Sequence, residues 1–457
     1  MSVKPRTALT DRPSGAVSLS GMAWKARNQR LAPSSNSSGQ GVVAAGVVAA
    51  GVTGRGYRRA PTPDTALAVA GRSVPRRVTS TGMSSHTHAR FAADVYADRL
   101  ERAVESMRAA HLDALLITPG PDLRYLVGSA AQSFERLTCL VITSDGATPS
   151  VVIPKLELAA LADSAVGELG LRVLDWVDGV DPYQLVRSTL HAGSRVAVAD
   201  AMPALHLIPL AASFSGLPVS ATPVLRELRM IKDAAEIEAL RRAGAAIDRV
   251  HARMGEFLQV GRTEAEVGDD IAAALVEEGH LEADFVIVGS GPHGADPHHG
   301  VSQRRIERGD VVVIDIGGPV EPGYFSDCTR TYSMGEPASE IAARFAELER
   351  AQAAAVAAVR PGVTAESVDA AARNLLTEAG FGDAFVHRTG HGIGLSVHEE
   401  PYIVAGNDLP LRPGMAFSIE PGIYFRGEWG ARIEDIVVVT EDGCESMNNR
   451  PHGLTVL

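Results

Sequence analysis

Two stretches of the 457-residue chain repeat one pattern, and this repeat constrains the fold more than any other feature of the sequence. The run Gly261-Arg-Thr263-Glu-Ala-Glu-Val267 returns as Gly362-Val-Thr364-Ala-Glu-Ser-Val368, so that Thr263 and Thr364 stand 101 residues apart. Each threonine predicts the N-cap of a helix, and Thr263 with Glu266 predicts a capping box. We therefore expect the second half of the chain to contain a duplicated half-domain.

The repeat continues into two apolar runs that predict strands. Gly309-Asp-Val-Val-Val-Ile-Asp315 matches Gly414-Met-Ala-Phe-Ser-Ile-Glu420, with an acidic residue six positions after the glycine in each run. A second acidic residue follows in each half, Asp327 and Glu434. Carboxylates at the ends of two related pairs of strands would converge, and burying them without a cation costs several kcal/mol. The pattern therefore predicts a metal site.

His391 completes the predicted set of metal ligands. Divalent cations take carboxylate and imidazole ligands, and two cations about 3.5–4 Å apart need carboxylates that bridge them. The glycines on both sides of His391 argue against a helix shared with His387, so we expect one ligand on an extended segment. The alternative is that the acids pair with Arg330, Arg432 and backbone amides, but the matching offsets of the whole set favour metal.

The remaining motifs are less specific. His298 and His398 are candidates for holding substrate and stabilising an oxyanion, although a lone histidine more often has a structural role. We interpret His299 as spacing. Gly289-Ser-Gly-Pro-His-Gly294 matches the dinucleotide fingerprint, but Pro292 and the residues after it are poor material for the helix that binds a pyrophosphate.

The chain between Phe91 and about Val224 predicts an α/β unit without a cluster of chemically useful residues. Its clearest elements are a helix and three strands, at Tyr96–Ala110, Ala114–Thr118, Leu137–Thr143 and Val151–Pro154. A long amphipathic helix is expected to follow and to join two domains. Its apolar face would carry Ile237, Leu240, Ile247, Val250 and Met254, with Glu236 and several arginines mostly off that face.

Composition excludes several classes of protein. The formal net charge of −12 disfavours binding to nucleic acid or to an anionic membrane, and no run reaches the roughly 20 apolar residues of a membrane span. Three scattered cysteines provide no disulfide framework, which favours a reducing, cytoplasmic compartment.

Residues 1–86 differ in composition from the rest of the chain. Asp11 and Asp64 are the only acids before Met83, and large apolar residues are too few to offset the entropy of ordering. An Arg-rich, acid-poor start is typical of an organelle transit peptide. We favour the simpler interpretation, a disordered extension that results from a start codon assigned upstream of the true one.

Taken together, the motifs resemble those of the creatinase/prolidase/methionine aminopeptidase family of metallopeptidases, family M24. They are Asp296-Pro-His298-His-Gly, Val313-Ile-Asp315-Ile-Gly-Gly, Gly323-Tyr-Phe-Ser-Asp327-Cys-Thr-Arg-Thr, His387-Arg-Thr-Gly-His391-Gly-Ile-Gly-Leu, Val397-His398-Glu-Glu-Pro, Ser418-Ile-Glu420-Pro-Gly and Arg432-Ile-Glu434-Asp. The resemblance covers Phe91 to the end and is closest to actinobacterial dipeptidases and Xaa-Pro dipeptidases. It implies an α+β fold, with a creatinase-type α/β domain at 87–224 and a pita-bread catalytic domain of two pseudo-two-fold halves at 225–457.

The resemblance also implies a mechanism. Two divalent ions, Mn²⁺ or Co²⁺ before Zn²⁺ or Fe²⁺, would share a bridging hydroxide that attacks the scissile carbonyl of a small peptide. Asp315 would bind one ion, His391 with Glu420 the other, and Asp327 with Glu434 would bridge them. Glu420 would also shuttle a proton, His298 and His398 would bind substrate and stabilise the oxyanion, and Arg432 would orient the carboxylate ligands. A homodimer is expected.

Three alternatives stay open at this point. The enzyme could be an Xaa-Pro aminopeptidase for longer peptides, a metal-free amidinohydrolase, or a metal-free binding protein on the same fold. One departure from the family pattern is visible, because the interval between Asp315 and Asp327 is one residue longer than in many members. We expect a longer hairpin loop at Pro319–Pro322.

Overall fold

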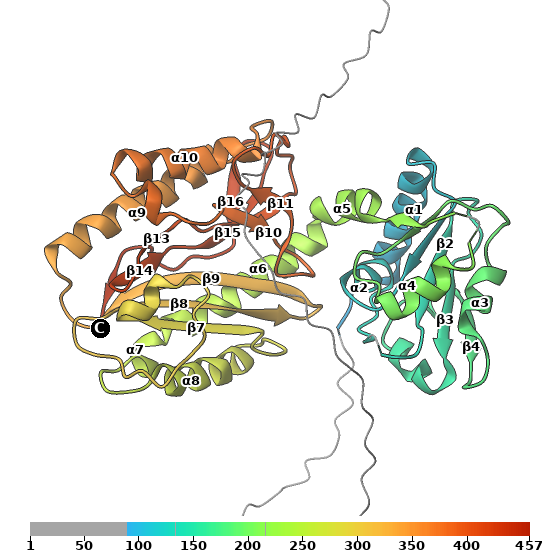
Figure 1. Ribbon diagram of the computed structural model, residues 1–457, viewed down its shortest axis with the longest axis horizontal. Helices are drawn as coiled ribbons and strands as arrows, with labels where there is room; N and C mark the ends of the chain where they lie inside the picture. Colours follow the sequence, from blue (N-terminus) through green and yellow to red (C-terminus); the bar gives the residue numbers. More distant parts are fainter. Residues whose placement is uncertain (1–88, 133, 215) are drawn as a thin grey trace, which may run out of the picture. The chain divides into compact units, whose positions relative to one another are not determined.

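The computed structural model describes residues 89–132, 134–214 and 216–457 (Figure 1). The predicted extension at 1–86 lies outside the described residues. No helix in the described ranges is both long enough and apolar enough to cross a membrane.

The first part of the described chain is built on a mixed six-stranded sheet with the strand order β4-β3-β2-β1-β5-β6. Its strands are β1 (Ala114–Ile117), β2 (Cys139–Thr143), β3 (Ser150–Pro154), β4 (Arg172–Trp176), β5 (Val196–Val198) and β6 (Val219–Ser220). Its helices are α1 (Ala93–Ala109), α2 (Pro121–Val127), the 3-10 helix η1 (Lys155–Leu161), α3 (Pro182–Ser188), α4 (Ala204–Ala211) and α5 (Thr222–Met230). The predicted α/β unit is therefore confirmed, and α5 spans the predicted domain boundary at 224/225, which stays a prediction.

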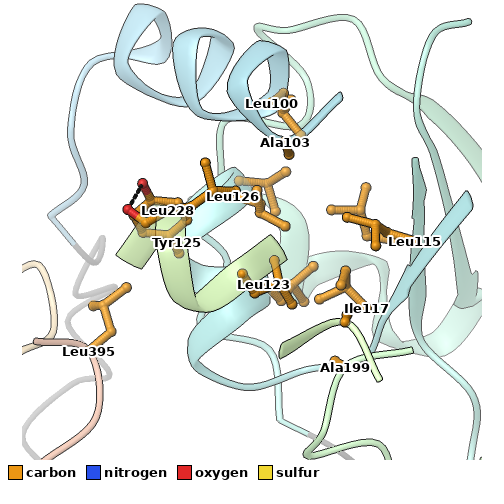
Figure 2. Close-up of a cluster of buried hydrophobic side chains, with 14 of the residues drawn as sticks. Leu100, Ala103, Leu115, Ile117, Leu123, Tyr125, Leu126, Ala199, Leu228 and Leu395 are labelled. Carbon is orange, nitrogen blue, oxygen red and sulfur yellow. Dashed lines mark hydrogen bonds between the residues drawn. The ribbon is translucent and has the colours of Figure 1, made fainter. Parts of the chain in front are cut away.

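Alternation along β1 explains why helices cover both faces of this sheet. Leu115 and Ile117 belong to one core with α1 and α2, whereas Ala114 and Leu116 belong to a second core with α3 and α4. Figure 2 shows the first core, in which Leu123 and Leu126 of α2 lie among Leu100 and Ala103 of α1 and the two β1 residues. The Tyr125 hydroxyl donates to the Leu228 carbonyl of α5 at 2.9 Å and ties α5 to this core (Figure 2).

The second part of the chain contains two larger sheets, each backed by its own helices, and a separate two-stranded sheet. The first half comprises α6 (Ala234–Ala252), α7 (Met254–Phe257), α8 (Glu264–Glu277), β7 (Phe285–Ser290), the 3-10 helix η2 (Gly291–Ala295), β8 (Val311–Val320) and β9 (Tyr324–Ser333). The second comprises α9 (Ser339–Ala358), α10 (Ala365–Glu378), η3 (Gly382–Ala384), β10 (Gly390–Gly392), β11 (Glu399–Ile403), β12 (Ala416–Ile419), β13 (Gly422–Phe425), β14 (Trp429–Arg432), β15 (Asp435–Val439) and β16 (Cys444–Ser446).

The larger sheets have the strand orders β17-β9-β8-β7 and β11-β10-β12-β15-β16, and β17 (Thr455–Val456) joins the first one. Strands β13 and β14 form the two-stranded sheet. Figure 1 shows α8 on the outer side of β7 and β8, and α9 and α10 on the outer side of the other strands. The predicted α+β fold with two related halves is confirmed.

The two halves repeat their helices closely and their caps only in part. Helices α8 and α10 both contain 14 residues and both begin directly after the predicted threonine. Thr263 makes the predicted capping box with Glu266. Thr364 occupies the N-cap position but makes no side-chain cap, whereas loop carbonyls accept from the first two N–H groups of both α8 and α10. Residue N3 of α10 is Ser367 rather than a glutamate, so no capping box forms.

The predicted long helix is interrupted. Met254 lies in the short α7 rather than at the end of α6, because the chain leaves helical geometry at Arg253. Glu236, expected mostly off the apolar face, is buried. It accepts a 2.8 Å hydrogen bond from the Tyr324 hydroxyl and lies 3.4 Å from the Arg99 guanidinium, so its charge is compensated inside the protein.

The burial of Arg99 generates a stability prediction. Its guanidinium contacts Asp233 at 3.1 Å and stacks 4.2 Å from the centre of the Tyr125 ring. Arg99→Ala leaves Glu236 as an uncompensated buried charge, which typically costs about 3–5 kcal/mol in the free energy of unfolding. Urea denaturation should measure a loss of this size.

The matched control lies one turn further along α1. Arg102 pairs with Asp98 at the surface, at 3.5 Å, so Arg102→Ala should change the free energy of unfolding by less than about 1 kcal/mol. Equal effects of the two variants would contradict a structural role for the buried arginine.

Candidate metal centre

The register of the β8–β9 hairpin brings the first two carboxylates together. Gly317 of β8 pairs with Asp327 of β9, and Asp315 lies two residues before Gly317, so both aspartates project from the same face of the hairpin. The hairpin closes with only three residues between Val320 and Tyr324. The predicted longer loop at Pro319–Pro322 is wrong, because Pro319 and Val320 continue the β8–β9 ladder. Asp327 is buried, and Asp315 is partly buried.

The second pair of carboxylates lies where β12 ends and β15 begins. Ile419 pairs with Asp435, so Glu420 and Glu434 are the next facing residues beyond the end of this ladder. The backbone N–H of Glu434 donates to the Thr329 carbonyl of β9 at 3.1 Å, and the Thr329 hydroxyl donates to Glu434 Oε2 at 2.8 Å. These bonds connect the two halves and bring all four carboxylates into one region.

His391 lies on β10, which is extended as the sequence predicts. A Cβ atom on Gly390 would lie 1.8 Å from the Ser418 carbonyl oxygen, so only glycine permits this close approach of β10 to β12. The Nδ1 atom of His391 lies 3.1 Å from the Gly392 carbonyl, which requires the proton on Nδ1 and leaves the Nε2 lone pair free. Nε2 lies 3.3 Å from Glu420 Oε1 and 3.6 Å from Asp327 Oδ2.

The charges of these side chains oppose one another. Burial, with the nearby charges of Glu434 and Asp315, raises the pKa of Asp327 far above its usual value, and burial with Glu420 and Asp315 does the same for Glu434. Burial also raises the pKa of Glu420 to about 7. Burial lowers the pKa of His391 to about 3, so its imidazole is neutral at physiological pH. The group therefore needs positive charge if its carboxylates are to ionise.

Two carboxylate oxygens confirm that this demand is not met by protein groups in the described part of the chain. Asp315 Oδ1 and Glu434 Oε1 are buried, and neither has a hydrogen-bond partner among the described residues. Ligand atoms of Asp327, His391 and Glu434 lie within 4.8 Å of one another. Buried carboxylate oxygens beside a neutral imidazole form a donor set that fits divalent cations.

Arg432 supplies part of the compensating charge. It donates to Asp315 Oδ2 at 2.6 Å and to the Tyr424 hydroxyl at 2.7 Å, so the alternative reading of an Arg432 ion pair is correct for one of the four acids. Arg330 pairs instead with Asp435 at 2.7 Å. Among the described residues, Arg432 forms an ion pair with only one of the four carboxylates, and this pairing leaves an excess of negative charge at the centre.

Sequence reasoning missed His387 and Tyr424 as members of this group. His387 Nε2 lies 2.8 Å from the Tyr424 hydroxyl, which links it through Arg432 to Asp315. His387 lies in a bend before β10 and joins the group only through Tyr424, which is 37 residues later in the chain. No local pattern in the sequence therefore identifies it.

A cavity of about 780 Å³ opens onto the four carboxylates. Its wall also contains His298, His398, His387 and Arg388. Burial and the positive charges of Arg388 and His298 lower the pKa of His398, whose ring centre lies 4.1 Å from that of His391. All predicted site residues therefore line one cavity, with the two exposed histidines at its solvent side.

His299 does not line this cavity. Its Nε2 atom lies 2.9 Å from Glu264 Oε2, so the interpretation of His299 as spacing is wrong. The segment at Gly291 is a 3-10 helix of five residues, which agrees with the rejection of a dinucleotide-binding helix.

Comparison with known proteins agrees with this geometry. Residues 99–231 match the creatinase/prolidase N-terminal domain, and residues 238–441 match metallopeptidase family M24. The chain is 66% identical to the "Probable dipeptidase PepE" of Mycobacterium tuberculosis over 369 residues, which cover 80% of this chain and 98% of that protein. It is 32% identical to the Xaa-Pro dipeptidase of Lactobacillus helveticus, over 78% of this chain and 98% of that protein.

Comparison with a solved structure indicates the same family. The crystal structure of dipeptidase PepE from Mycobacterium ulcerans superposes with a TM-score of 0.78 and 64% sequence identity, covering 80% of this chain and 99% of that one. Sequence and fold thus agree over both domains. The chain belongs to metallopeptidase family M24, and a creatinase/prolidase N-terminal domain precedes its peptidase domain.

Proposed function

We propose that the protein is a dipeptidase that depends on two divalent metal ions and prefers Xaa-Pro dipeptides. The observation that carries the proposal is the convergence of four carboxylates on a neutral imidazole, with two buried oxygens that have no partner among the described residues. Such a group is unfavourable unless cations occupy it. The alternative of a metal-free binding protein leaves this concentration of buried charge without a physical explanation.

We assign the ligands as the sequence predicts. Asp315 would hold one ion, His391 and Glu420 the other, and Asp327 and Glu434 would bridge. Mn²⁺ and Co²⁺ stay our preferred ions, on family resemblance. The homodimer and the cytoplasmic location also stay predictions.

Bound ions would supply a water of lowered pKa and would polarise the scissile carbonyl. The protein groups do the rest. Arg432 restrains Asp315 through the 2.6 Å bond, and the Gly392 carbonyl fixes the tautomer of His391. Glu420, whose Oε1 atom lies 3.3 Å from His391 Nε2, would carry a proton to the leaving nitrogen. His298 and His398 in the cavity wall would donate to the developing oxyanion and hold the ends of the substrate.

Arg388 favours a dipeptide over a longer peptide. Its side chain lines the cavity and stacks 4.6 Å from the centre of the Tyr402 ring, but it has no hydrogen-bond or ion-pair partner among the described residues. A free guanidinium beside an acidic centre is suited to bind a carboxylate. In a dipeptide the terminal carboxylate lies one residue beyond the scissile bond, so we assign Arg388 to that group.

Loss of a bridging ligand tests the metal centre. Asp327→Asn keeps the side-chain volume but removes the charge that would serve both ions, so metal content should fall. Mutation of a residue that only hydrogen-bonds to a metal ligand typically lowers metal affinity or activity by about 10- to 100-fold. Loss of a ligand itself should therefore lower the turnover of Ala-Pro by more than about 100-fold. Metal analysis and steady-state kinetics measure both effects. Asp178→Asn, at an exposed pair with Arg136, is the control, and full metal content in Asp327→Asn would contradict the assignment.

Removal of metal should make stability depend on pH in a defined direction. In the chelated protein the pKa of Glu420 is raised from 4.5 to about 7, so the folded state disfavours the ionised form. The stability associated with its protonated form is complete below pH 4.5 and is lost as the pH rises through 7. Thermal unfolding of chelated protein should therefore show a falling Tm across this window.

Restoring the ions should abolish that fall, since bound cations favour ionised carboxylates. An identical pH dependence of Tm with and without metal would mean that the four acids are compensated by protein groups alone.

A peptide panel tests substrate choice. The wild type should cleave Ala-Pro at least about tenfold faster in kcat/KM than Ala-Ala, which corresponds to about 1.4 kcal/mol. Arg388→Met removes a charged hydrogen bond worth about 1.5–3 kcal/mol, so kcat/KM for Ala-Pro should fall by about 10- to 100-fold. Ala-Pro-amide, which lacks the carboxylate, should be a poor substrate for both proteins.

Arg412→Met, at an exposed pair with Glu227, is the matched control and should leave these ratios unchanged. Equal losses of Arg388→Met on the acid and the amide would assign the arginine a structural role. Equal rates of the wild type on Ala-Pro and Ala-Ala would reject the proline preference and keep a less selective dipeptidase.

A further inference from the structure

A second group of metal-ligating side chains lies outside the catalytic cavity. Glu264, the first residue of α8, is fully buried, and two histidines from the loop after β7 converge on its carboxylate. Oε2 of Glu264 lies 2.9 Å from His299 Nε2 and 3.1 Å from His293 Nδ1. The centres of the two imidazole rings are 4.3 Å apart. We call Glu264, His293 and His299 the Glu264 cluster.

The spacing of the Glu264 cluster resembles that of the catalytic ligands. Its three ligand atoms lie within 4.8 Å of one another, as do those of Asp327, His391 and Glu434. Zinc ligands bonded at about 2.0–2.1 Å in a tetrahedron stand about 3.3 Å apart, so the contacts at 2.9 and 3.1 Å need to open by only a few tenths of an ångström.

The other carboxylate oxygen of Glu264 is already fixed. Oε1 accepts from the backbone N–H of Ser290 at 2.9 Å and from the Ser290 hydroxyl at 2.6 Å, while the Ser302 hydroxyl donates to Oε2 at 2.5 Å. Outer hydrogen bonds of this kind orient carboxylates that bind metals. In this orientation Oε2 faces His299, and His293 Nδ1 lies 3.1 Å from both carboxylate oxygens.

Among the described residues, Glu264 forms no ion pair with a lysine or an arginine. Although burial raises the pKa of Glu264, hydrogen bonds from Ser290, Ser302 and His299 lower it to about 2, so the side chain is ionised. The nearest guanidinium in its network, that of Arg304, reaches Ser290 but forms its ion pair with Asp310, at 2.6 Å. The Ser290 and Ser302 hydroxyls supply hydrogen bonds but no charge, and a cation held between the carboxylate and the two imidazoles would offset the buried negative charge.

We propose that Glu264, His293 and His299 bind a third metal ion, a divalent transition metal such as Zn²⁺, outside the catalytic centre. Two imidazole nitrogens and one carboxylate oxygen match the ligand preference of zinc. The side chains of His293 and His299 are 36% and 15% exposed, so an ion can enter from solvent and keep water as its fourth ligand. The ion would anchor the loop that carries His298 into the catalytic cavity, because its two histidine ligands lie on both sides of His298.

The number of zinc ions bound per chain tests this site. The unmodified protein and the double variant His293→Asn/His299→Asn are stripped with chelator, reloaded with Zn²⁺, dialysed and analysed by mass spectrometry for metal per chain. The asparagines retain a donor for Glu264 while removing both imidazoles. The double variant should bind one equivalent fewer, whatever number of ions the catalytic centre holds, so failure here is separate from failure of the proposed function.

The control is His111→Asn/His191→Asn, two exposed histidines of the first domain, which should bind as many equivalents as the wild type. Anomalous diffraction at the zinc edge from unmodified crystals gives an independent measurement that needs no variant. An anomalous peak between Glu264 and the two histidines supports the site. Equal zinc counts in the wild type and the His293/His299 variant, or no peak, would overturn it and assign the group to a closed hydrogen-bonded cluster.

Discussion

Mutual repulsion among four carboxylates is the constraint on which the rest of the catalytic domain depends. Asp315, Asp327, Glu420 and Glu434 are held together by strand registers and by backbone bonds between the halves, against their electrostatic preference. Burial, together with the neighbouring carboxylate charges, raises the pKa of Asp327 and Glu434 far above their usual values. Two large apolar cores behind the sheets supply the stability that keeps the strands in place.

Much of the catalytic site could be predicted because the positions of its residues follow from short patterns in the local sequence. The carboxylate six residues after a glycine occurs in both halves, and the offset survives folding because each strand starts two residues after its glycine. The capping box at Thr263 and the extended segment at His391 follow from short-range rules of the same kind. The lack of a side-chain cap at Thr364 shows their limit, since the equivalent threonine caps α8 but not α10.

What the sequence did not reveal depends on contacts between distant segments. Glu236 looks like a surface residue on a helical wheel, and only the approach of Arg99 and Tyr324 makes its burial possible. His299 has a partner 35 residues earlier in the chain, and His387 reaches Arg432 only through Tyr424. No periodicity in a single segment encodes such pairs.

The duplication has an evolutionary consequence. Each half contributes one carboxylate pair, and neither pair alone can surround two cations. A primordial chain of one half-domain could therefore have built the centre only on the two-fold axis of a symmetric dimer. Fusion of the genes would then have allowed the two copies to diverge. Two differences between the halves fit that history. The imidazole ligand comes from the second half only, and the two acids of the first half lie diagonally across their strands rather than face to face.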